Sequence, residues 1–143
     1  NNQVMCWSNY IVTPIVLKKP LRVYKVGTLT TLGGFRSLYH KFVYRKSKAV
    51  PTVKINPEFI KYSTFSPLDK SWMHNAFFIN EGYHSYLNKE IAKHRRNTNE
   101  ELGIFEYEEV GIFEIPSGAT IYVNYRYEEV VSTDIKYLGL LKL

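Results

Sequence analysis

Apolar and polar residues alternate in two stretches of the first third of the chain. In LRVYKVGTL (21–29), successive side chains face opposite sides of an extended chain, which predicts a strand that ends at Gly27. FRSLYHKFVYRK (35–46) alternates in the same way, and TTLGGF (30–35) between the two supplies a turn. We therefore expect these residues to form two strands paired as in a hairpin.

Two other segments lack this period. Residues 1–20 mix apolar residues with two prolines, which favours an extended N-terminal arm over a long helix. Residues 46–67 contain Pro51, Pro57 and Pro67 and few periodic runs. We expect this second segment to be an irregular excursion, with room for a short strand or turn.

The second half of the chain changes its pattern twice. WMHNAFFIN (72–80) is short and apolar, which favours a buried strand. The following stretch has a helical period and predicts one helix from about Ser85 to Asn97. Residues 103–143 are rich in β-branched and aromatic residues, with turns at PSG and STD, and predict three or more mostly antiparallel strands.

These elements predict an α+β fold, with one domain over residues 1–143. A mostly antiparallel, twisted sheet would carry one main α-helix. A chain of 143 residues can build one substantial core and is short for two ordinary domains. The twelve tyrosines favour β-structure and a contact face, because tyrosine joins an apolar ring to a polar tip.

Charge and cysteine content narrow the class of protein. A net charge of +6 attracts anions, which indicates a nucleotide, a nucleic acid or an acidic protein as the partner. The single cysteine, Cys6, cannot form an internal disulfide, which fits a reducing cytoplasm. No apolar run predicts a membrane span, and no Cys/His spacing predicts a zinc site. We therefore expect a cytoplasmic protein that uses no metal or other cofactor.

The segment NEGYHSYLNKEIAKHRR (80–96) is the candidate ligand site. A helix that begins at Ser85 would point its free N–H groups and its positive dipole end at His84, an arrangement that holds phosphates and carboxylates. Basic helix residues can contact phosphates and tyrosines can stack on bases. The alternative is a structural junction, in which Ser85 caps the helix and the tyrosines pack on the core. The candidate ligand-binding residues are Tyr83, His84, Ser85, Tyr86, Lys89, Lys93, Arg95 and Arg96.

Several segments resemble a family of short uncharacterised proteins encoded by Bacteroidetes bacteria and their phages. The resemblance is carried by MCWSN from Met5, PIVLKKPLRVYKV ending at Val26, EGYHSY (81–86), GIFEIPSGATIYVN (111–124) and EEVVSTDIKYL (128–138). It implies that Met5 is the native start and that the protein acts in a phage or prophage setting. Small basic proteins in that setting often bind host machinery, so we expect a non-enzymatic protein that binds an acidic host component and inhibits a host defence.

A partial resemblance to ADP-ribosyltransferases supplies an alternative. Arg22, the STFS segment that begins at Ser63, and Glu129 occur in the order Arg, Ser-Thr-Ser, Glu that is typical of one group of these enzymes. The resemblance implies that the arginine and serine hold NAD and that the glutamate stabilises the ribosyl cation. The segment departs from that pattern because Phe65 interrupts the Ser-Thr-Ser run.

Overall fold

The computed structural model describes residues 5–8, 14–37, 42–64, 72–79, 81–101, 108–125 and 127–143. The strands are β1 (Met5–Ser8), β2 (Ile15–Val16), β3 (Leu21–Leu29), β4 (Phe35–Ser37), β5 (Val43–Tyr44), β6 (Glu58–Thr64), β7 (Trp72–Ile79), β8 (Tyr83–Tyr86), β9 (Glu108–Ile115), β10 (Thr120–Asn124), β11 (Glu129–Ser132) and β12 (Lys136–Leu140). The helix α1 (Lys89–Glu101) lies between β8 and β9.

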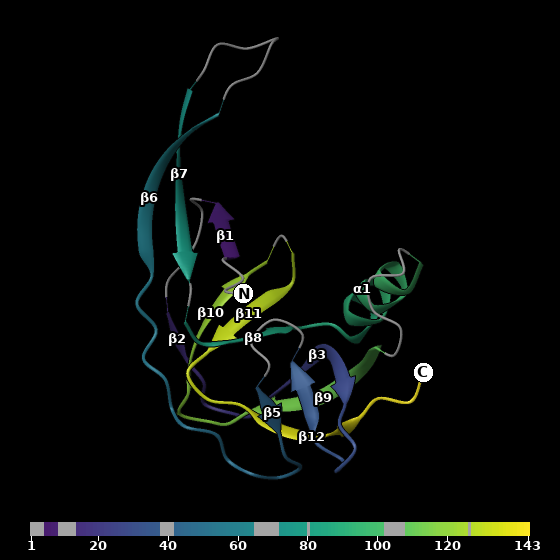
Figure 1. Ribbon diagram of the computed structural model, residues 1–143. Coiled ribbons are helices and arrows are strands. Elements are labelled where there is room, and N and C mark those ends of the chain that lie inside the picture. Colours follow the sequence, from purple (N-terminus) through teal and green to yellow (C-terminus); the bar gives the residue numbers. More distant parts are fainter. Residues whose placement is uncertain are drawn as a thin grey trace.

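The described strands form two sheets, in which every pairing is antiparallel. The larger sheet has nine strands, with the order β12-β9-β3-β8-β11-β10-β2 and a side branch in which β4 pairs with both β3 and β5. The smaller sheet has the order β1-β7-β6, and its β6–β7 hairpin extends away from the larger sheet (Figure 1). In the described residues, the predicted architecture of a mostly antiparallel sheet with one helix is therefore confirmed, although strands predominate.

The main core lies on one face of the larger sheet and is built around Phe35. This ring stands 5.4 Å from the ring centroids of both Phe113 and Tyr137. It rests on two glycines, because a Cβ atom added at Gly27 or Gly111 would come within 2.6 Å and 2.9 Å of its ring atoms. Glycine at these two strand positions is what lets the aromatic ring approach the backbone of the sheet.

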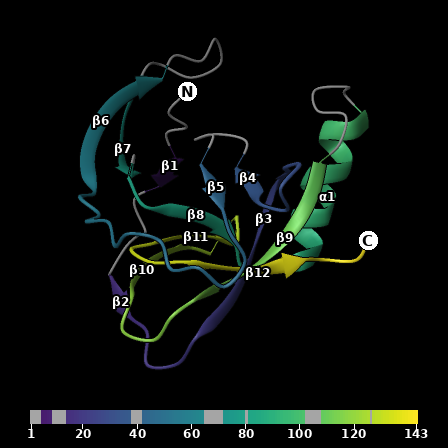
Figure 2. The ribbon, with the colours of Figure 1, turned by 60° about the horizontal axis from the view of Figure 1, so that its bottom comes forward.

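The opposite face of β3 and β9 is covered by α1. Ala92 of the helix is fully buried and packs with Val26 and Val110. Figure 2 shows α1 lying along β9. Strand β3 is therefore covered on both faces, and it continues two residues beyond Gly27, where the sequence predicted its end.

The prediction of one strand over residues 35–46 is wrong, because the described part of this segment forms two short strands. Strands β4 and β5 fold back on one another, with Phe35 opposite Tyr44 and the Ser37 N–H donating to the Phe42 carbonyl at 3.0 Å. In one continuous strand, Phe35 and Tyr44 would face opposite sides. Folding back brings both rings to the core, where Tyr44 packs 5.0 Å from Phe113. Residues 38–41 lie outside the described residues.

The remaining predicted elements agree in part with the structure. The excursion predicted over residues 46–67 includes a seven-residue strand, β6, while residues 45–57 are largely irregular. The strand predicted over residues 72–80 is β7, although the burial predicted for it falls mostly on side chains outside the described ones. The C-terminal region forms the predicted strands as β9 to β12. Within residues 1–20, β1 pairs with β7 and β2 with β10.

Candidate functional site

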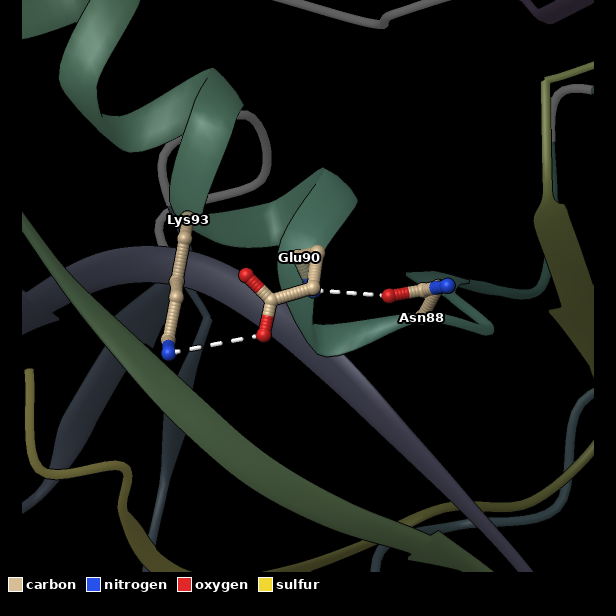
Figure 3. Close-up of polar contacts among 3 residues, drawn as sticks. All are labelled: Asn88, Glu90 and Lys93. Atoms are coloured by element: carbon tan, nitrogen blue, oxygen red, sulfur yellow. Dashed lines mark hydrogen bonds and ion pairs between the residues drawn. The ribbon is translucent and has the colours of Figure 1, made fainter.

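The candidate residues ahead of the helix form a strand and not a helix N-terminus. Tyr83–Tyr86 is β8, which lies between β3 and β11. The helix begins at Lys89, and the Asn88 side-chain oxygen accepts a hydrogen bond from the Glu90 N–H at 2.7 Å (Figure 3). Asparagine is a preferred N-cap residue. The predicted helix start and cap at Ser85 are therefore wrong, and Asn88 is the cap.

Strand geometry separates the four residues of β8. Tyr83 and Ser85 are buried on the face of the main core, and the Tyr83 hydroxyl donates to the Pro51 carbonyl at 2.6 Å. His84 and Tyr86 face the side on which α1 lies, because successive strand residues point to opposite faces. No helix N-terminus lies at these residues, and two of the four side chains lie on each face of the sheet. Ligand binding by the four residues stays a prediction.

The predicted basic residues of the helix lie close to partners of their own. Lys93 Nζ is 3.6 Å from the Glu90 carboxylate (Figure 3). Arg96 Nε donates to the Glu108 carbonyl at 3.0 Å. Arg95 lies near Glu129 and favours the charged form of that carboxyl. Of the four predicted cations on α1, Lys89 is exposed and is in no ion pair with a described residue.

The residues of the transferase alternative lie on two different sheets. Glu129 of β11 lies opposite Tyr86, which in turn lies opposite Tyr24 of β3. This register places Arg22 and Glu129 on the same face of the larger sheet, with β8 between their strands. Burial raises the pKa of Glu129, and the Arg95 charge offsets part of that increase. Ser63 lies on β6, in the smaller sheet.

A buried lysine that sequence reasoning did not select lies at the centre of the larger sheet. Lys25 is 7% exposed, and its Nζ donates to the His84 carbonyl at 2.5 Å. The same Nζ is 5.3 Å from the Tyr44 ring centroid and 5.8 Å from that of Phe113. Burial lowers the pKa of Lys25 to about 7. Its position on the apolar side of the alternating stretch 21–29 was the available signal.

The chemistry open to Lys25 follows from this enclosure. An amine with a pKa near neutrality can act as a base or nucleophile. Ser85 lies opposite Lys25 on the adjacent strand and is 4% exposed, and its Oγ has no hydrogen-bond partner among the described residues. Because Tyr44 and Phe113 cover the amine, the geometry favours titration inside the core over contact with a large substrate.

Positive charge is unevenly distributed along the chain. Sequence reasoning used the net charge and missed this asymmetry. Residues 1–57 hold ten of the nineteen Lys and Arg residues and none of the thirteen Asp and Glu residues. Residues 58–143 hold the other nine basic residues and all thirteen acidic ones. The first segment thus carries +10 and the second −4, which together give the net +6.

Part of the acid-free segment forms an exposed basic surface, which we define as Arg36, Arg45, Lys46 and Lys48. Arg36 follows Phe35 on β4 and so points away from the core, and Arg45, Lys46 and Lys48 lie directly after β5. All four basic residues are exposed. A turn with a positive φ at Ser47 holds the last three together, and the Ser47 N–H donates to β12. None of the four is in an ion pair with a described residue.

The turn after β5 lies beside β12, because the Ser47 N–H donates to the Tyr137 carbonyl and Ala49 forms a β-bridge with Lys136. Among the described residues, no group of three or more His, Cys, Asp or Glu side chains could hold a metal ion. The described helix is too short and too polar to cross a membrane.

Comparison with models of protein families, with curated proteins and with solved structures finds no match to this chain.

Proposed function

We propose that the protein binds an anionic partner without catalysing a reaction, and that the partner contacts the basic surface. The observation that carries this proposal is the acid-free segment, whose exposed cations on β4 and in the turn after β5 have no carboxylate partner among the described residues. Neighbouring cations of one sign sum their fields and attract anions from solution.

The basic surface supports this role better than the predicted helix cations do. On α1, Lys93 is paired with Glu90, and Arg95 lies near Glu129. A cation that already has a carboxylate neighbour contributes little net field to an incoming anion.

The partner is either a nucleic acid or an acidic protein, both of which meet the same charge requirement. The resemblance to phage-encoded proteins supports a partner in the cytoplasm of a host cell and inhibition of a host defence as the outcome. The transferase-like alternative rests on a narrower observation, namely that Arg22 and Glu129 share one face of the larger sheet. If that alternative holds, the wild-type protein should consume NAD and the Glu129→Gln variant should not.

The test compares two variants that remove the same amount of charge. One variant carries Arg45→Gln, Lys46→Gln and Lys48→Gln, and the control carries Lys89→Gln, Lys93→Gln and Arg95→Gln. The probes are labelled single-stranded and double-stranded DNA and polyglutamate, and binding is followed by fluorescence anisotropy over a range of salt concentrations.

We expect the first variant to bind at least one probe more weakly, and the control to bind like the wild type. With DNA, the slope of log affinity against log salt should fall by about 2 to 3, because each lost phosphate contact removes close to one unit. Equal losses in both variants would show that net charge alone drives binding, and a larger loss in the control would place the site on α1. Wild-type protein that binds no probe would contradict the proposal itself.

A further inference from the structure

Lys25 lies at a junction in the pairing of β3. One edge of β3 pairs with β9 from Leu21 to Thr28 without interruption. On the other edge the partner changes from β8, at Tyr24, to β4, at Gly27. Lys25 sits between these two contacts, and its Nζ bonds the His84 carbonyl of β8. Lys25 therefore lies where one edge of β3 changes its partner strand.

The titratable groups that face Lys25 offer it no strong counter-charge. They are Tyr44 of β5, Tyr83 of β8, Tyr137 of β12 and Glu109 of β9. Burial raises the pKa values of the three tyrosines, so these remain neutral. Glu109 lies opposite Gly27, and its charge helps to raise the pKa of Tyr137. The lowered pKa of Lys25 is due to burial, with no contribution from Glu109. His84 and Glu129 carry their side chains on the other face of the sheet.

Strand β5 is the smallest element that covers this amine. It has two residues, and among the described strands it pairs with β4 alone. The Ser37 N–H, which donates to the Phe42 carbonyl, links β4 to the start of β5. Residues after β5 are held separately, because the Ser47 N–H donates to Tyr137 on β12. Movement of β5 alone would carry Tyr44 off the amine and leave the other strands in place.

We propose that β5 is a pH-responsive cover: when Lys25 takes up a proton, β5 moves outward with Tyr44 and admits water to the ammonium group. An ammonium group in an apolar core is costly unless water or a paired charge reaches it. Of the strands over Lys25, β5 is the shortest, and β4 is its one pairing partner among the described strands. This inference is independent of the proposed function, although β5 leads directly into the basic surface.

The direction of the response follows from proton linkage. The covered amine has a pKa of about 7, and the uncovered amine returns towards 10.5. The uncovered state therefore binds more protons between these values, and its population grows as pH falls towards 7. Below pH 7 both states are protonated and the population stops changing. From pH 9 to pH 6, the equilibrium constant for uncovering should rise by roughly 50- to 100-fold.

The experiment combines two nuclear magnetic resonance measurements on the full chain. The Lys25 side-chain Cε and Nζ resonances are titrated to locate the pKa. The hydrogen-exchange protection of the Ser37 amide is measured at pH 9 and pH 6, with the Thr133 amide, which donates to the Thr120 carbonyl, as the reference. Both amides are also followed in Lys25→Met and in Lys54→Met, which removes an exposed lysine instead.

We expect Lys25 to titrate near pH 7. In the wild type and in Lys54→Met, the protection of the Ser37 amide should fall by roughly 50- to 100-fold from pH 9 to pH 6. In Lys25→Met, Ser37 protection should not depend on pH. In the wild type, Ser37 should be less protected than Thr133 at both pH values, because Ser37 exchanges when β5 opens and Thr133 exchanges only when the larger sheet unfolds. A Lys25 pKa near 10.5 would overturn the proposal. It would equally be overturned if Ser37 and Thr133 were equally protected at both pH values, or if Lys25→Met kept the response. The wild-type measurements decide the question even if Lys25→Met fails to fold.

Discussion

The side chain of Lys25 on β3 donates a hydrogen bond to the backbone carbonyl of His84 on β8, which follows it by 59 residues. The direct backbone pairing of these two strands is limited to Tyr24 and Tyr86. Strands β3 and β8 thus pair through their backbones at one residue pair, and the hydrogen bond from the Lys25 side chain is a second link between them. The same bond gives the buried amine one polar partner in an otherwise aromatic environment.

Lys25 should make the stability of the whole protein depend on pH. Because its folded pKa of about 7 lies below the unfolded value of 10.5, the unfolding free energy should rise with pH across this interval. The limiting slope is about 1.4 kcal/mol per pH unit. Urea denaturation at pH 7, 8 and 9 should show this rise in the wild type and a smaller one in Lys25→Met. Identical slopes in the two proteins would contradict a buried, titrating amine.

The helix cap can be tested by comparing two polar residues. Asn88→Ala should lower the unfolding free energy by about 1 kcal/mol, because the Glu90 N–H loses its acceptor. Ser85→Ala should cost much less, since the Ser85 Oγ has no hydrogen-bond partner among the described residues. Thermal or urea denaturation measures both. A larger loss for Ser85→Ala would restore the cap that the sequence predicted.

The contact between Phe35 and Gly111 should appear as coupling between two substitutions. Gly111→Ala places a Cβ atom 2.9 Å from the Phe35 ring and 2.8 Å from Phe113, so it should cost about 1–3 kcal/mol. In a Phe35→Leu background one of these clashes is relieved, and the added cost of Gly111→Ala should be smaller. A double-mutant cycle by urea denaturation measures the difference. Strictly additive losses would mean that Phe35 does not rest on Gly111.

Glu129 should destabilise the folded protein at neutral pH. Burial raises its pKa, so the folded state favours the protonated form, and the associated stability is lost as pH rises through the folded pKa. Glu129→Gln, which removes the charge, should therefore raise the unfolding free energy at pH 7 and have a smaller effect at pH 4. If the variant is instead less stable at pH 7, the attraction of Arg95 outweighs the cost of burial.

Local patterns determined much of the secondary structure. Alternation over 21–29 marks β3, the apolar run over 72–80 marks β7, and the β-branched and aromatic C-terminal region marks β9 to β12. These predictions succeeded because side-chain direction in a strand has a period of two that is visible in the sequence. The absence of acidic residues before Glu58 is likewise a property of the sequence alone.

Tertiary structure decided the features on which the candidate site depends. The sequence predicted a helix from Ser85, whereas pairing with β11 makes residues 83–86 a strand and divides their side chains between two faces. The fold-back of β4 and β5 is favoured because only that arrangement brings both Phe35 and Tyr44 to the core. Alternation over 21–29 puts Lys25 on the apolar side of β3, but the ring that covers its amine comes from Tyr44, nineteen residues later, and only the tertiary structure brings the two together.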